Sequence, residues 1–160
     1  MTPRARLTLG VVVGVFAAVL VVSAQSKDPL VGTWVLNVAK SKYTPGPAPK
    51  SATTTIETVG GGYKFTVHQV PATGPDQNWT FITNFGGQPA KITGNNPLAD
   101  AATYTKVNAT TYDSVQTMKG KETQRQHVVV SADGKTRTVT STGTDAKGQK
   151  INNVAVYEKK

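Results

Sequence analysis

Ten short runs rich in Thr, Val, Tyr and other strand-forming residues follow one another from residue 33 to the end of the sequence. Clusters of Gly, Pro, Asn and Asp separate them, which is typical of an all-β domain with many short strands. In the run 63–70, the side chains of Tyr63, Phe65 and Val67 alternate with polar ones, which predicts one buried face and one solvated face. No run in this region has an apolar period of about 3.6 residues, so we expect no long helix.

The turns between the runs indicate how the strands connect. Asp133-Gly134 fits a tight hairpin, because Asp-Gly readily adopts the positive φ angles of that turn type. Sequential hairpins predict an antiparallel up-and-down meander, and closing it into a β-barrel of about 8–10 strands removes the exposed edges. The expected strands are residues 33–38, 52–59, 63–70, 78–85, 89–93, 101–107, 110–118, 122–130, 136–142 and 150–158.

The first 24 residues have the layout of a secretory signal peptide. Arg4 and Arg6 precede an uncharged apolar run at residues 7–22, and small residues follow up to Ala24. We expect cleavage after about Ala24, a linker at residues 25–29 and one barrel domain at residues 30–160, in a secreted or periplasmic protein. An uncleaved membrane anchor is the alternative, but the apolar run has 16 residues, whereas a spanning helix needs about 20.

Composition narrows the chemistry that the chain can support. The sequence contains no cysteine, which excludes thiol catalysis, disulfides and cysteine-ligated metals. Its two histidines have no metal-ligand spacing, so we expect no metal and no cofactor. The formal net charge is +9, which attracts anionic partners. The lysines are spread along the chain and are not interleaved with aromatic residues, so specific nucleic-acid binding is not expected.

The opening and closing runs resemble a known superfamily. Gly32-Thr33-Trp34 at the first strand is similar to the start of calycins, which include the lipocalins and the fatty-acid-binding proteins. Residues 156–159 look like the closing strand of the fatty-acid-binding group. The chain also resembles a group of small bacterial secreted proteins that share this opening, the Pro-rich segment after it and an SADGKT-type hairpin.

The resemblance implies a lipocalin-like barrel whose interior holds a small apolar molecule. Trp34 would close one end, and Gly32 would allow another segment to approach the strand start. A basic side chain from late in the chain packs across this tryptophan in lipocalins, and here either Lys159 or Arg137 could do so.

One departure from the resemblance concerns the ligand. Fatty-acid-binding proteins usually hold the ligand carboxylate with an arginine two residues before the closing tyrosine. Tyr157 is present here, but Ala155 occupies the arginine position. A fatty-acid headgroup would therefore lose a charge-assisted bond, unless Arg125 substitutes for the missing cation by facing inward.

The candidate ligand-binding residues come from the aromatic faces and from the run 122–130. That run has two open registers, because both of its faces mix polar and apolar residues. In one register Arg125 and His127 point inward as a polar cluster, and in the other they face solvent. The aromatic residues fit a cavity lining or an ordinary core. The candidates are Tyr63, Phe65, Trp79, Phe81, Phe85, Arg125, His127 and Tyr157.

These observations favour an exported, monomeric, lipocalin-like protein that binds a small hydrophobic or amphipathic molecule. The alternative is an envelope-associated interaction module without an internal ligand, which binds anionic surfaces through its excess of lysines and presents the Pro-rich segment at residues 44–50. No catalytic constellation can be identified, so we do not expect an enzyme and predict no catalytic residue.

Overall fold

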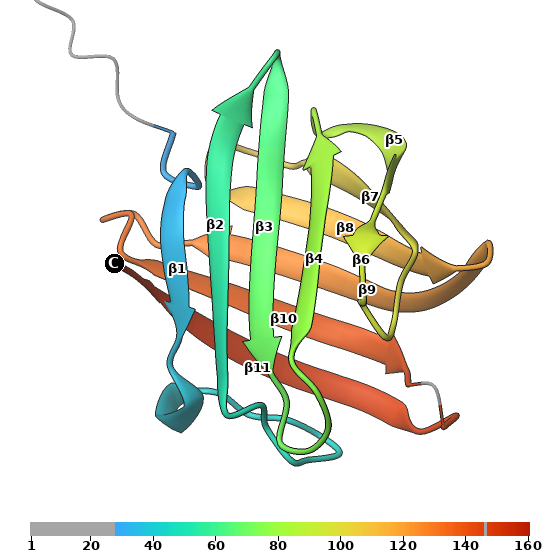
Figure 1. Ribbon diagram of the computed structural model, residues 1–160. Coiled ribbons are helices and arrows are strands. Elements are labelled where there is room, and N and C mark those ends of the chain that lie inside the picture. Colours follow the sequence, from blue (N-terminus) through green and yellow to red (C-terminus); the bar gives the residue numbers. More distant parts are fainter. Residues whose placement is uncertain (1–27, 146) are drawn as a thin grey trace, which may run out of the picture.

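The computed structural model describes residues 28–145 and 147–160, which form an all-β protein (Figure 1). The predicted signal peptide and most of the predicted linker lie outside the described residues. The strands are β1 (Gly32–Leu36), β2 (Ser51–Val59), β3 (Gly62–Val70), β4 (Gln77–Thr83), β5 (Gly86–Lys91), β6 (Thr93–Gly94), β7 (Ala101–Lys106), β8 (Thr111–Met118), β9 (Lys121–Val130), β10 (Thr136–Thr144) and β11 (Lys150–Lys159), with a short 3-10 helix η1 (Val38–Lys40).

The eleven strands form one antiparallel sheet in the order β5-β7-β8-β9-β10-β11-β1-β2-β3-β4-β6. Strand β1 pairs with both β2 and β11, so the first and last strands lie side by side. In Figure 1, β1–β4 cross in front of β7–β11, which encloses an interior between them. The two ends of the sheet, β5 and β6, are separated in sequence only by Ile92, so the chain itself spans the seam of a nearly closed barrel.

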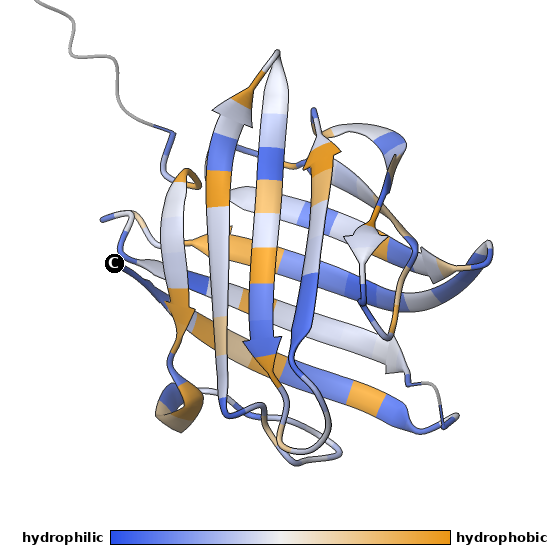
Figure 2. Ribbon diagram, viewed as in Figure 1, coloured by the Kyte–Doolittle hydropathy of each residue, from blue (hydrophilic) through white to orange (hydrophobic). Residues whose placement is uncertain are grey.

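Alternating side chains place the core inside this barrel. Hydrophobic and hydrophilic bands alternate along β2 and β3 in Figure 2. On β2, Ala52, Thr54 and Ile56 are buried and face inward, while their neighbours are more exposed. The antiparallel meander and the all-β barrel expected from the sequence are therefore confirmed.

Some strand boundaries differ from the expected ones. The first strand ends at Leu36 and η1 follows it, because the Asn37 side chain accepts a hydrogen bond of 3.1 Å from the Lys40 backbone N–H and starts a helical turn. The single strand expected at residues 89–93 is instead β5 and β6. The fourth strand ends at Thr83, and Phe85 adopts a positive φ of 59° that turns the chain into β5.

No helix among residues 28–145 and 147–160 is long and apolar enough to cross a membrane. Asp28 and Pro29, expected at the end of a linker, contact the barrel. The Asp28 carboxylate accepts a hydrogen bond of 2.5 Å from the Tyr63 hydroxyl, and the Pro29 carbonyl accepts one of 2.7 Å from the Lys159 ammonium.

Candidate functional site

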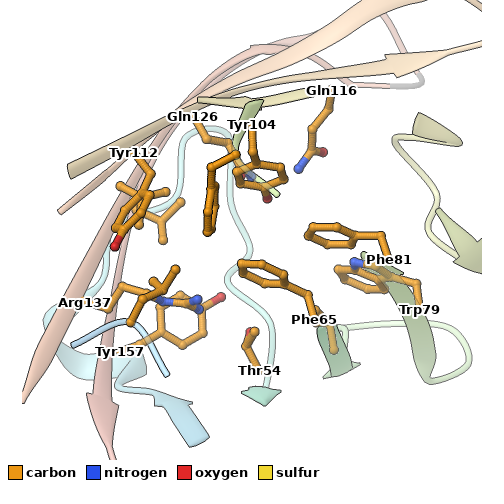
Figure 3. A pocket seen from close by; sticks show the side chains of 15 residues that line it. Thr54, Phe65, Trp79, Phe81, Tyr104, Tyr112, Gln116, Gln126, Arg137 and Tyr157 are labelled. Carbon is orange, nitrogen blue, oxygen red and sulfur yellow. The ribbon is translucent and has the colours of Figure 1, made fainter. Parts of the chain in front are cut away.

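A cavity of about 90 Å³ lies within the barrel (Figure 3). Strands from both crossing layers of the sheet contribute to its wall. The lining residues are Leu30, Thr54, Phe65, Val67, Trp79, Phe81, Phe85, Tyr104, Tyr112, Gln116, Gln126, Val128, Arg137, Val139 and Tyr157.

One wall of the cavity is aromatic. Phe65 on β3 and Phe81 on β4 are direct cross-strand partners, and their rings stack at 4.6 Å between centroids with an interplanar angle of 9°. Tyr104 on β7 stacks at 5.3 Å from Phe81. Three nearly parallel rings thus stack against one another as an apolar cluster at the cavity, and Figure 3 labels all three.

The polar wall of the cavity comes from side chains of β8 and β9, next to Tyr104 (Figure 3). Gln126 donates a hydrogen bond of 2.8 Å to the Gln124 side chain and accepts one of 3.3 Å from the Ser114 hydroxyl. Ser114 and Gln124 are both buried. Burial of amides and hydroxyls is costly unless they are hydrogen-bonded, and this network supplies the partners.

The register of β9 corrects one sequence-based option. Val128 and Val130 are buried, and the period of two then sends Arg125 and His127 to the outer surface. Arg125 forms an ion pair of 2.6 Å with Glu122, and His127 shares a hydrogen bond of 2.6 Å with Asp113. The prediction that Arg125 and His127 form an inward-facing polar cluster is therefore wrong. Gln124 and Gln126 occupy the inward face of β9 instead.

The aromatic candidates divide into two groups. Tyr63 lies beside the cavity rather than in its lining. Its ring packs 4.7 Å from that of Phe85, and its hydroxyl donates to Asp28. The others lie on the cavity wall, where their role as ligand contacts stays a prediction; they are Phe65, Trp79, Phe81, Phe85 and Tyr157.

Arg137 is one of several cavity residues that sequence reasoning did not assign to the ligand site; Tyr104, Tyr112, Gln116 and Gln126 are others. Arg137 is the second residue of β10, lies directly opposite Tyr157 on β11 and is 5% exposed. Its guanidinium lies 4.5 Å from the Tyr157 ring and 5.5 Å from the Trp34 ring. The signal in the sequence was the alternation in β10, where Arg137 shares a face with the cavity residue Val139.

The charge of Arg137 has no anionic partner in the described chain. Within residues 28–145 and 147–160 it forms no salt bridge, and its Nε atom has no hydrogen-bond partner. Burial lowers the pKa of the guanidinium, whereas the nearby Tyr157 and Tyr104 raise it. Arginine stays charged in proteins because its reference pKa is so high, so the cavity contains a cation.

The phenols around the cavity act as neutral hydrogen-bonding groups. Burial raises the pKa of Tyr104, and burial also raises that of Tyr157 although Arg137 acts in the opposite direction. Neither phenol is therefore prepared to act as a base near neutral pH. Among the described residues, no three His, Asp or Glu side chains come together as metal ligands.

Trp34 on β1 is fully buried in the main hydrophobic core, and its role in closing one end of the barrel stays a prediction. Its Nε1 atom donates a hydrogen bond of 2.8 Å to the Leu30 carbonyl. The Lys159 ammonium lies 4.7 Å from the ring, so both Lys159 and Arg137 contact this tryptophan. Gly32 has a φ of 136°, a backbone conformation that favours glycine, whereas a Cβ at this position would make only van der Waals contact, at 3.4 Å, with the Lys159 side chain. The backbone conformation therefore accounts for this glycine, and the close approach suggested by the sequence stays a prediction.

Ala155 lies away from the cavity. It is buried in a separate cluster with Leu36 and Ala52. An arginine at that place in the chain is therefore not needed to bring a cation to Tyr157, because Arg137 approaches the ring from the neighbouring strand.

The fold and the site together define a nearly closed antiparallel β-barrel with an amphipathic internal cavity. The chain matches no protein-family model and no curated protein. Among solved structures it is similar to the zebrafish ileal bile acid-binding protein complexed with cholic acid, with 14% sequence identity and a TM-score of 0.46 over 82% of this chain and 99% of that chain. The assignment of the fold rests on the strand order described above.

Proposed function

We propose that this protein binds a small amphipathic molecule inside its barrel. The observation that carries the proposal is the two-sided cavity, with stacked aromatic rings on one wall and amides, hydroxyls and Arg137 on the other. Binding sites typically combine an apolar lining with a few polar groups that fix the ligand's orientation. A molecule with one apolar and one polar part matches both walls at once.

The buried polar residues favour a binding role over a purely structural interior. Thr54, Gln116 and Ser141 are each less than a tenth exposed and lie within the barrel. An all-apolar core would stabilise the barrel without the desolvation cost of such groups. We infer that the polar wall is retained because it contacts a ligand.

Binding rather than catalysis is the activity that we assign to the cavity. Its ionisable groups are the tyrosines and Arg137, and burial keeps the phenols of Tyr104 and Tyr157 protonated. Binding of anionic surfaces through the lysines, the alternative raised by the sequence, stays a prediction. Salt-dependent retention of the protein on anionic vesicles would support that alternative.

We also propose that the protein acts after export, because residues 1–24 have the layout of a signal peptide. N-terminal sequencing of the protein from its native host tests this. The expected result is a chain that starts at Gln25, and a chain that retains the apolar run would contradict it.

The binding proposal can be tested with native mass spectrometry of the protein isolated from its host. We expect a small molecule to co-purify and to be lost in Val128→Phe, which fills the cavity from β9. Val129→Phe is the matched control, because Val129 is the next residue on the same strand and is 38% exposed. Equal ligand occupancy in the two variants, or a wild-type protein that neither co-purifies with a molecule nor binds one added in excess, would contradict the proposal.

A further inference from the structure

Arg137 brings a charge into the cavity without bringing its counter-ion. Among the described residues that line the cavity, it is the only charged one. Buried charges in proteins are normally paired, because taking an ion out of water costs several kcal/mol. Each buried polar atom without a partner therefore calls for an explanation, and here the Nε atom of Arg137 is such an atom.

The two aromatic contacts of Arg137 repay only part of that cost. The guanidinium lies 4.5 Å from the Tyr157 ring and 5.5 Å from the Trp34 ring. Cation–π contacts attract the positive charge, but an aromatic ring does not supply hydrogen-bond acceptors for the N–H groups of the guanidinium. A planar carboxylate accepts two of these donors at once, which makes it the natural complement of a guanidinium.

The size of the cavity limits what the carboxylate can be attached to. The volume is about 90 Å³, which is smaller than the cavity of about 150 Å³ that benzene fits. The space therefore suits a molecule with fewer non-hydrogen atoms than benzene. A long acyl chain or a sterol is larger than this volume.

We propose that the cavity binds a compact organic monoanion, a short-chain carboxylate of the size of acetate or propionate. The carboxylate contacts Arg137, and the alkyl part faces the stacked rings of Phe65 and Phe81. One cation in the lining balances one negative charge. This inference rests on the proposed binding function and names the class of ligand for the same cavity.

The test is a titration of the ¹⁵N-labelled full-length chain, followed by backbone amide chemical shifts at constant ionic strength and chloride. Propionate is expected to give saturable shifts around the cavity with a dissociation constant in the micromolar to millimolar range, because so few atoms can contribute only limited binding energy. Propionamide, its neutral isostere, is expected to bind at least tenfold more weakly. Octanoate is expected to give no saturable shifts around the cavity.

Variants assign the effect to the guanidinium. Arg137→Met is expected to weaken propionate binding at least tenfold, and Arg137→Lys, which retains the charge, less than Arg137→Met does. Arg125→Met removes an exposed arginine and is expected to leave propionate binding unchanged. Thermal unfolding of each variant confirms that it is folded.

Several outcomes would overturn the inference. They are propionamide binding as tightly as propionate, octanoate binding more tightly, Arg137→Met binding normally, or nitrate binding as tightly as propionate. If propionamide binds in the cavity and Val128→Phe abolishes its binding, the proposed amphipathic site stands and only the anionic assignment fails. If no molecule binds or co-purifies, both fail.

Discussion

The two arginines in the described part of the chain lie in opposite environments. Arg125 on β9 is on the outer surface and pairs with Glu122 at 2.6 Å. Arg137 on β10 is 5% exposed and faces two aromatic rings instead of a carboxylate. An exposed ion pair contributes little to stability because water screens it, so Arg125 is replaceable. A buried cation without a counter-ion opposes folding, so the retention of Arg137 requires another reason.

The difference shows that the alternation of side chains along a strand decides whether an arginine is buried in the barrel or exposed to solvent. A shift of one residue along β9 or β10 would exchange inward and outward side chains. The buried valines of β9 and the burial of Arg137 and Ser141 on β10 show which face turns inward. The same residue type thus serves solubility at one position and, in our proposal, ligand binding at the other.

Trp34→Ala is expected to have the largest effect, because it removes a fully buried ring that contacts the buried arginine. Truncation of a buried Trp typically costs about 3–5 kcal/mol of unfolding free energy. Chemical denaturation measures this change. Val35→Ala is the control on the same strand, where the side chain is 37% exposed and a much smaller loss is expected. Similar losses in both variants would contradict the buried position of Trp34.

Arg137→Met sharpens the comparison between the two arginines. Replacing buried ionic groups by apolar residues of similar volume often stabilises a protein, by about 1–4 kcal/mol, and lost cation–π contacts offset part of this gain. We therefore expect the ligand-free variant to be at least as stable as the wild type in urea denaturation. Arg125→Met should change stability by less than about 0.5 kcal/mol. A loss above about 2 kcal/mol in Arg137→Met would instead make the guanidinium structural.

The Tyr63 hydroxyl tests how firmly the start of the chain is held against the barrel. The hydrogen bond to Asp28 is the main cause that raises the pKa of Tyr63 from 10.0 to about 12, and burial of the phenol is the second cause. The protonated phenol therefore stabilises the fold below pH 10, and this contribution is lost as the pH rises from 10 to 12. Absorbance titration of the wild type and Tyr63→Phe should show one phenol ionising near pH 12 that the variant lacks. Ionisation near pH 10 would contradict the contact.

The smallest effect concerns the hairpin that leads into Arg137. The Ser131 hydroxyl and the Lys135 backbone N–H, both donating to Asp133, hold the pKa of that carboxyl below its usual value. A lowered carboxyl pKa stabilises the fold above the usual pKa, and the gain disappears as the pH falls through the lowered value. Asp133→Asn should therefore lower the melting temperature slightly at pH 7 and match the wild type in strong acid. An equal difference at both pH values would contradict this cause.

Much of the architecture could be predicted from the sequence, because turn residues and alternation are local signals. The Asp133-Gly134 turn and the alternation of Tyr63, Phe65 and Val67 identified the hairpin and the inward face. The end of β1 and the division of β5 from β6 depend on the Asn37 cap and on closure of the barrel. Those features are less evident in a local pattern.

The sequence indicated only part of the aromatic lining. Alternation favoured inward-facing rings at Phe65, Trp79 and Phe81, which do line the cavity, but it did not single out Tyr104 and Tyr112. The polar half depends on strand register, which mixed residues on β9 left open, and Arg125 was considered where Arg137 is the buried cation. Pairing across β10 and β11, which brings Arg137 opposite Tyr157, emerges only when the strands are aligned.

The side-chain Nε–H resonances of the two arginines test the central claim most directly. In the full chain labelled with ¹⁵N at arginine Nε, variants at Arg125 and Arg137 assign the two signals. Addition of propionate is expected to shift the Arg137 signal in a saturable way, as its unpartnered Nε–H gains an acceptor, and to leave the Arg125 signal in place. An Arg137 signal that does not move, or two signals that move alike, would contradict the assignment of Arg137 as the ligand-binding cation.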